Sequence, residues 1–185
     1  FVYQLVRPGA RAREYEDAIL WLEQAGLVNK VLLSKAPKLP LKAYDDLGTF
    51  KLYTLDLGLL RKLSELDASI LLLPTPAYTE YKGALAENYI LQSLTAQFQM
   101  PFRYWTSGNK AEVDFLLQYI NQIYPIEVKA DQNIQGKSLI QYEKLFQPAC
   151  RIRYSMLNLK QDGNLLNIPL FLADKTRELL GVINV

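Results

Sequence analysis

The most informative feature of this 185-residue sequence is what it lacks. It contains no histidine, which excludes a Ser-His-Asp or Cys-His triad, a histidine-based zinc site and any nuclease that uses histidine as its base. Its one cysteine, Cys150, excludes an intrachain disulfide and a zinc knuckle, and it fits a reducing compartment such as the cytoplasm. No apolar run approaches the roughly 18 residues of a membrane-spanning helix, so we expect no membrane partner. Any chemistry must come from carboxylates, Lys and Arg, hydroxyl groups or backbone.

The composition is that of a globular chain. Half of the residues are hydrophobic and 22% are charged, which is more apolar surface than a disordered chain carries. Lys+Arg 21 against Asp+Glu 19 gives a net charge of +2, so no global field draws the chain onto nucleic acid or a membrane. The chain begins with Phe1 rather than Met, and its first six residues carry no charge. We therefore expect a piece cut from a longer protein, without a signal peptide.

The first 73 residues have the pattern of a winged-helix-like segment. A predicted helix over residues 10–25 ends at Gly26, and the elements predicted after it are strands over 27–33 and 50–55 and a helix over 57–66. Such a segment either serves as a brace between domains or docks on DNA, and the basic residues for docking are Arg7, Arg11 and Arg13. The break at Pro74-Thr75-Pro76 predicts a boundary between this segment, 1–73, and a second domain, 74–185.

The second domain reads as a mixed sheet flanked by helices. Its predicted helices cover residues 83–98, 137–146 and 175–180, and its predicted strands cover 102–105, 112–118, 123–129, 151–156 and 168–172. Helices and strands alternate irregularly along this half of the chain. We therefore predict an α/β (α+β) fold class.

Two neighbouring predicted strands concentrate carboxylates. In the first, Val113, Phe115 and Leu117 are expected on one face and Asp114 on the other, together with Glu112. A two-residue turn at Ile120-Asn121 would pair the strands in one register. That register sets Asp114 opposite Glu127, and Glu112 opposite Lys129.

Like charges across a ladder destabilise it, so this arrangement calls for a compensating cation. Lys129 is one candidate, and a divalent metal is the other, because Mg²⁺ is held by one or two carboxylates plus water and phosphate. Glu87 adds a third acid on the apolar stripe of the helix over 83–98, where a charged residue needs a partner. The alternative is a surface hairpin with a Glu112–Lys129 salt bridge, which leaves Glu87 unexplained.

Several motifs carry a resemblance to known nucleases. Asp114 followed by Glu127-Val128-Lys129 resembles the D…(D/E)-x-K core of the restriction-endonuclease-like (PD-(D/E)xK) superfamily. Gly83-Ala84-Leu85-Ala86-Glu87 resembles the G-x-x-x-E helix of its RecB-type branch. Ser138-Leu139-Ile140-Gln141-Tyr142 is similar to the Q-L-x-x-Y helix of that branch, with Ser138 in place of Gln.

A second resemblance covers almost the whole chain. Segments such as Trp21-Leu22-Glu23-Gln24-Ala25-Gly26, Phe50-Lys51-Leu52-Tyr53 and Pro125-Ile126-Glu127-Val128-Lys129 resemble the C-terminal region, domain of unknown function 4143, of bacterial and archaeal AAA+-type ATPases. The resemblance implies an ATP-binding module N-terminal to this chain, with ATP bound only there. Full-length ATPases of this kind often assemble as rings, so a homo-oligomer is one expected assembly.

The nuclease resemblance implies a role for each residue. Asp114 and Glu127 would hold Mg²⁺ or Mn²⁺, with Glu87 as a direct or water-mediated ligand and the Val128 carbonyl completing the shell. Lys129 would orient the attacking water. Ser138 and Tyr142 would support the metal ligands without contacting the ion. Glu112 would replace Asp114 as a ligand if the register between the two strands were shifted by two residues.

Two functions follow from these patterns. The first is a nuclease-like, DNA-interacting region of an AAA+-type ATPase with Mg²⁺-dependent phosphodiester hydrolysis. The second is a non-catalytic module that binds DNA or protein, in which Glu87, Asp114, Glu127 and Lys129 are a relic site or a polar core network. A small-molecule or regulatory domain is a third alternative.

Overall fold

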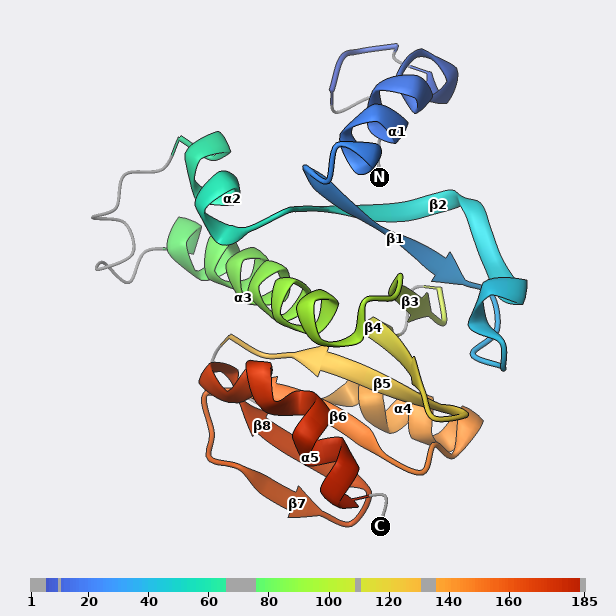
Figure 1. The fold of residues 1–185 in the computed structure, drawn as a ribbon, viewed down its shortest axis with the longest axis vertical. Coiled ribbons are helices and arrows are strands. Elements are labelled where there is room, and N and C mark those ends of the chain that lie inside the picture. The colour runs from blue at the N-terminus through green and yellow to red at the C-terminus, as the bar shows by residue number, and fades with distance from the viewer. Residues whose placement is uncertain (1–5, 10, 66–75, 109–110, 131–135, 184–185) are drawn as a thin grey trace.

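The computed structural model describes residues 6–9, 11–65, 76–108, 111–130 and 136–183 (Figure 1). One mixed eight-stranded sheet runs through them in the order β2-β1-β3-β4-β5-β6-β8-β7. The strands are β1 (Val28–Ser34), β2 (Asp45–Thr54), β3 (Arg103–Thr106), β4 (Glu112–Tyr119), β5 (Gln122–Val128), β6 (Arg151–Ser155), β7 (Lys160–Asp162) and β8 (Leu165–Pro169). The helices are α1 (Glu16–Gln24), α2 (Leu57–Leu63), α3 (Pro76–Phe98), α4 (Lys137–Phe146) and α5 (Thr176–Ile183), with short 3-10 segments η2 (Ala12–Glu14), η3 (Leu41–Tyr44) and η5 (Leu170–Lys175).

The mixed sheet with its helices confirms the predicted α/β fold class, and the ends of two helices follow from the local sequence. Gly26 adopts a φ of +70°, which favours glycine, and its N–H donates to the Glu23 carbonyl oxygen at the end of α1. Asp56 caps α2, because its side chain accepts a hydrogen bond from the Leu59 N–H at 2.8 Å. Within the described residues, no helix is both long and apolar enough to cross a membrane.

The N-terminal strands belong to the common sheet. β1 pairs with β2 in antiparallel fashion and with β3 in parallel fashion, so the first two strands form one edge of the eight-stranded sheet. An ion pair between Arg103 at the start of β3 and Asp45 at the start of β2 joins the two parts. The predicted winged-helix-like segment is therefore not confirmed. The predicted boundary after residue 73 falls within residues 66–75, outside the described residues.

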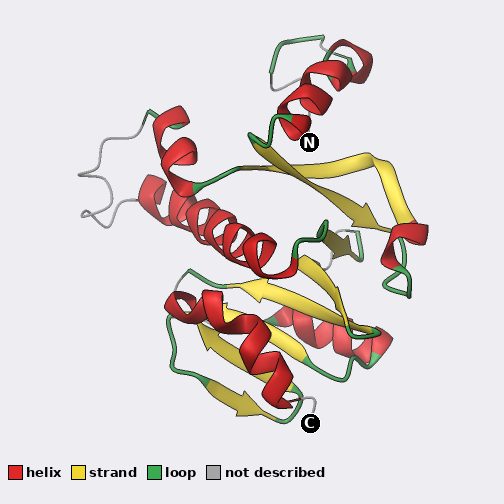
Figure 2. Ribbon diagram, viewed as in Figure 1, coloured by secondary structure: helices red, strands yellow, loops and turns green. Residues whose placement is uncertain are grey.

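Helices pack on both faces of the sheet (Figure 2). On one face, α3 and α5 cover the larger core cluster, whose buried members include Ile90, Leu94, Phe115, Ile126 and Leu180. On the other face, α4 covers a smaller cluster, formed by Leu41, Trp105, Ala111, Val113, Leu116, Leu139 and Tyr142. We call these two faces the α3 side and the α4 side.

The β4–β5 hairpin has the predicted turn and register. Ile120 and Asn121 form the turn with φ values of 45° and 57°, the geometry that a two-residue hairpin turn requires. Phe115 pairs with Ile126, and the same register continues to the pair Tyr119 and Gln122. The predicted register is therefore confirmed from the turn to the pair Phe115 and Ile126.

Asp114 lies where β4 changes face. The register between β3 and β4 shifts by one residue between Arg103 and Trp105, a shift typical of a β-bulge. As a result Val113 lies in the α4-side cluster, whereas Phe115 and Leu117 lie in the α3-side cluster. The prediction that these three residues share one face is wrong. Because a bulge re-aims side chains, it also sets the direction of the Asp114 carboxylate.

Candidate functional site

Asp114 is the central group of the candidate site. Its Oδ2 accepts a hydrogen bond from the backbone N–H of Val128 at 2.7 Å, which joins the bulge in β4 to the end of β5. Burial, followed by the charge of Glu87 and to a smaller extent that of Glu127, raises the pKa of Asp114 to about 7, against the opposing effects of the Val128 hydrogen bond and the Lys51 charge. Asp114 therefore lies close enough to both acids to be influenced by their charges.

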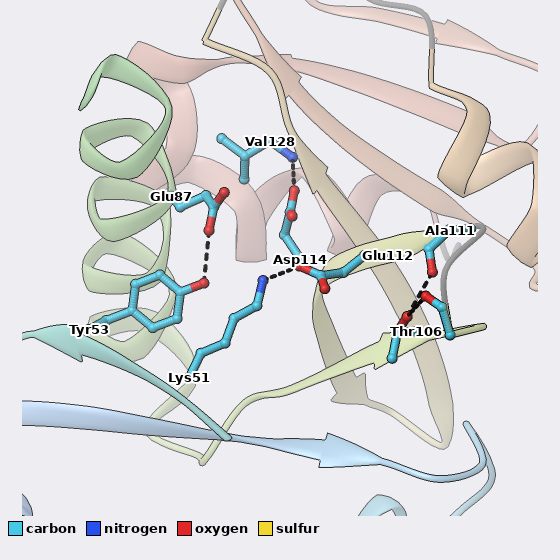
Figure 3. Close-up of polar contacts among 9 residues, drawn as sticks. Lys51, Tyr53, Glu87, Thr106, Ala111, Glu112, Asp114 and Val128 are labelled. Carbon is cyan, nitrogen blue, oxygen red and sulfur yellow. Dashed lines mark hydrogen bonds and ion pairs between the residues drawn. The ribbon is translucent and has the colours of Figure 1, made fainter. Parts of the chain in front are cut away.

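Glu87 faces the sheet from α3, as its place on the apolar stripe predicts. Its Oε2 accepts a hydrogen bond from the Tyr53 hydroxyl at 2.8 Å (Figure 3). Burial and the neighbouring Glu87 charge raise the pKa of Tyr53, so this hydroxyl keeps its proton and remains a donor. A cavity of about 400 Å³ between β2, α2 and α3 is lined by Glu87 together with Leu52, Thr54, Leu60 and Gly83.

Lys51 is the functional residue that the sequence analysis missed. Its ammonium forms an ion pair with Glu112, and its side chain extends between Glu87 and Asp114 (Figure 3). Burial alone lowers the pKa of Lys51, but the hydrogen bond to Glu112 and the charges of Glu87, Glu112 and Asp114 outweigh burial and raise it. Lys51 is thus a compensating cation for the acids on the α3 side. Lys51 and Tyr53 are two residues apart on β2 and therefore lie on the same face of that strand, which the sequence alone could indicate. Their acidic partners, Glu112 and Glu87, are distant in the sequence and could not be identified in this way.

Glu127 and Lys129 form a separate pair. Ile126 and Val128 belong to the α3-side cluster, so the alternation of the strand directs Glu127 to the α4 side. Lys129 Nζ lies 2.9 Å from Glu127 Oε1, and the Glu127 side chain is only 3% exposed. Glu127 Oε2 is buried and makes no hydrogen bond within the described part of the chain. The alternative prediction of a Glu112–Lys129 salt bridge is wrong, because Glu112 pairs with Lys51 and Lys129 with Glu127.

Among the described residues, no hydrogen bond or ion pair joins the remaining predicted residues to Glu87, Asp114 or Glu127. Tyr142 is buried in the α4-side cluster, edge-on to Trp105 with ring centroids 5.3 Å apart, and Ser138 lies in the first turn of α4. Arg7 forms an ion pair with Glu14 at 2.6 Å, and it is exposed, as are Arg11 and Arg13. The structure thus gives Tyr142 a packing role.

The acidic side chains would supply only part of the coordination shell of a metal ion. Among the described residues, no group of three or more His, Cys, Asp or Glu side chains is arranged to hold one ion. Glu87, Asp114 and Glu112 lie around Lys51, whereas Glu127 is directed to the other face. Mg²⁺ needs fewer protein ligands, because it commonly binds one or two carboxylates and completes its shell with water and substrate phosphate. Asp114 and Glu127 are the two carboxylates considered for this smaller requirement, because the charge of Glu127 reaches Asp114 and raises its pKa, although Glu127 projects to the α4 side.

Comparison with known protein families gives one match in the N-terminal part of the chain and one in the C-terminal part. Residues 1–70 match the family model described as a domain of unknown function, DUF8612. The predicted resemblance to a single family over almost the whole chain is therefore replaced by two matches, to two different families. No curated protein and no solved structure matches the chain. Residues 82–171, the segment that contributes Glu87, Asp114, Glu127 and Lys129, match the family described as a domain of unknown function, DUF4143.

Proposed function

We propose that this chain is the nuclease-like, DNA-interacting region of an AAA+-type ATPase, with Asp114 and Glu127 as ligands of Mg²⁺. The observation that carries the proposal is the buried Oε2 of Glu127, which has no hydrogen-bond partner among the described residues. An unsatisfied buried carboxylate oxygen is unfavourable, and a cation would satisfy it. The high pKa of Asp114, about 7, supports the same site, because a bound cation would relieve the repulsion from Glu87 and Glu127.

Each residue has a definite task in this proposal. When bound, Mg²⁺ lowers the pKa of a water ligand and neutralises charge that develops on the phosphate. Asp114 and Glu127 hold the ion, with the Val128 carbonyl beside them. The Lys129 ammonium, 2.9 Å from Glu127, orients the attacking water and offsets negative charge. Glu87, held by Tyr53, contributes negative charge behind Asp114.

A second function is favoured by Lys51. Its ammonium already offsets the charges of Glu87, Glu112 and Asp114, so these acids form a polar network that is complete without a metal. In that case the chain is a non-catalytic DNA- or protein-binding module of the ATPase, and the carboxylates are a relic site. The two functions share one fold and differ in metal affinity.

Titration calorimetry with MgCl₂ and MnCl₂ tests the proposed function. The wild-type chain is expected to bind either ion, and Asp114→Asn and Glu127→Gln are each expected to weaken binding by at least about 10- to 100-fold, because the loss of a group that merely supports a metal ligand already costs that much. The control is Asp162→Asn, because Asp162 is 78% exposed on β7 and its replacement changes the net charge equally. Absence of heat from the wild-type chain would favour the non-catalytic module. If the wild type and Glu127→Gln nick supercoiled plasmid at the same rate, that result would also favour the non-catalytic module.

Replacement of Lys129 separates metal binding from catalysis. Lys129→Gln is expected to lower the nicking rate by about 100-fold, because a charged group placed beside the reacting atoms contributes on that order. Its calorimetric titration with Mg²⁺ should retain the wild-type heat, since Lys129 is not a ligand. Loss of the heat in Lys129→Gln, with an unchanged unfolding midpoint, would contradict the role assigned to this residue.

A further inference from the structure

A row of polar residues crosses the sheet from the candidate site to its far edge. The strand registers align Glu127 on β5 with Arg153 on β6, Arg153 with Asn167 on β8, and Asn167 with Lys160 on β7. Aligned residues of neighbouring strands project from the same face, so this row lies on the α4 side with Glu127. Three inter-strand spacings of about 4.8 Å separate the first and last strands, so the row extends over about 14 Å.

The far end of the row opens into a pocket. A cavity of about 370 Å³ is lined by Arg153, Lys160 and Asn167 and by the apolar side chains of Leu157, Leu159 and Leu165. This volume lies within the range of about 300–1,000 Å³ that is typical of small-molecule sites. The pocket therefore combines cationic and amide groups with an apolar wall.

The walls of the pocket are held in place by buried hydrogen bonds. Asn167 is only 3% exposed, and its Oδ1 accepts hydrogen bonds from Arg153 Nε at 2.9 Å and from the Ser155 hydroxyl at 2.8 Å. Its Nδ2 donates to the Asn158 carbonyl oxygen at 2.9 Å, which fixes the loop that carries Leu157 and Leu159. The pocket is thus preformed, a condition that reduces the entropy lost on binding.

The charge of the pocket suits an anion. Lys160 and Arg153 outnumber the one acid that lines it, Asp162, which lies 3.8 Å from Lys160. Burial lowers the pKa of Arg153, while the charge of Glu127 acts in the opposite direction and helps keep the guanidinium charged. A guanidinium is well suited to phosphate, and leucine side chains suit a flat apolar group such as a nucleobase.

We propose that this pocket binds one nucleotide of a single-stranded nucleic acid, adjacent to the nucleotide that lies at Glu127 and Lys129. The proposal deepens the proposed function and rests on its nucleic-acid part, not on catalysis. Arg153 and Lys160 contact the phosphate, and Leu157, Leu159 and Leu165 contact the base. A strand is favoured over a free nucleotide because accessible cations stand at both ends of the row, Lys129 with 32% and Lys160 with 73% of its side chain exposed, which is farther apart than one phosphate reaches.

Fluorescence anisotropy with a labelled single-stranded DNA oligonucleotide, in EDTA, tests this pocket. Lys160→Ala is expected to weaken binding about 3- to 10-fold and to reduce the salt slope by about 0.7, the value for one lost phosphate contact on a single strand. Lys175→Ala is the matched control, because Lys175 also forms an exposed ion pair, with Glu178 at 3.1 Å, and carries the same charge. It should leave both quantities near their wild-type values.

A second variant tests the apolar wall without a change in charge. Leu159 is 45% exposed, so Leu159→Ser should fold normally, and it is expected to weaken binding about 3-fold with an unchanged salt slope. Leu63→Ser, at a position 66% exposed on α2, is its control. Equal affinities of Lys160→Ala and Lys175→Ala would overturn the pocket even if Asp114→Asn loses metal binding. A selective effect of Lys160→Ala would support the pocket even if the wild type binds no metal.

Discussion

Replacement of Asp45 by alanine is expected to lower the free energy of unfolding by about 3–5 kcal/mol, the loss typical when one partner of a buried ion pair is removed. The Arg103 guanidinium donates from two nitrogens to the two carboxylate oxygens of Asp45, each at 2.9 Å. The side chains are only 10% and 9% exposed, so the remaining guanidinium would lose its charge partner away from water. Urea unfolding followed by the fluorescence of the buried Trp105 measures the change.

The exposed pair of Lys175 and Glu178 is the matched control for this ion pair. These side chains are 50% and 72% exposed, and Glu178→Ala should leave the free energy of unfolding near its wild-type value, because exposed ion pairs contribute little. Because Asp45 is on β2 and Arg103 is on β3, a large effect of Asp45→Ala would show that the N-terminal strands and the rest of the sheet unfold together. An effect as small as that of Glu178→Ala would contradict this coupling.

Local patterns were sufficient to predict the β4–β5 hairpin. Its short turn and the alternation of apolar residues permitted one register, and the structure has that register from Phe115 to Tyr119. The helix predicted over residues 137–146 is present as α4, whose buried residues Leu139 and Tyr142 share one face. In both cases the residues that define the element are close neighbours in the sequence.

Features that depend on distant pairing could not be predicted in this way. The bulge at Asp114 arises from the pairing of β4 with β3, and the N-terminal strands join the sheet through the parallel pairing of β1 with β3. Strand propensity does not specify such partners. Lys51 was missed for the same reason, since its contact with Glu112 joins residues 61 positions apart.

Replacement of Asp114 by asparagine is expected to stabilise the protein at high pH. The folded-state pKa of Asp114 is about 7, above the ordinary value of 3.8, so the folded protein binds this proton more tightly than the unfolded chain. Wild-type stability is therefore highest with Asp114 protonated and falls as pH rises through about 7. Asparagine removes this penalty and its amide oxygen can still accept the Val128 N–H. The gain of Asp114→Asn over wild type should grow by on the order of 2–3 kcal/mol between pH 5 and pH 8.

Urea unfolding of both proteins across that pH range measures the gain, with Asp162→Asn as the control at an exposed carboxylate. A gain that does not change with pH would show that the Asp114 carboxylate is ionised in the folded protein throughout. The same variant connects stability with function, because a ligand that binds only the folded state stabilises it in proportion to its affinity. If Asp114 is a metal ligand, Mg²⁺ should restore at pH 8 part of the stability that the wild type loses there, and it should leave Asp114→Asn unchanged. If Lys51 alone offsets the acids, Mg²⁺ should act equally on both proteins.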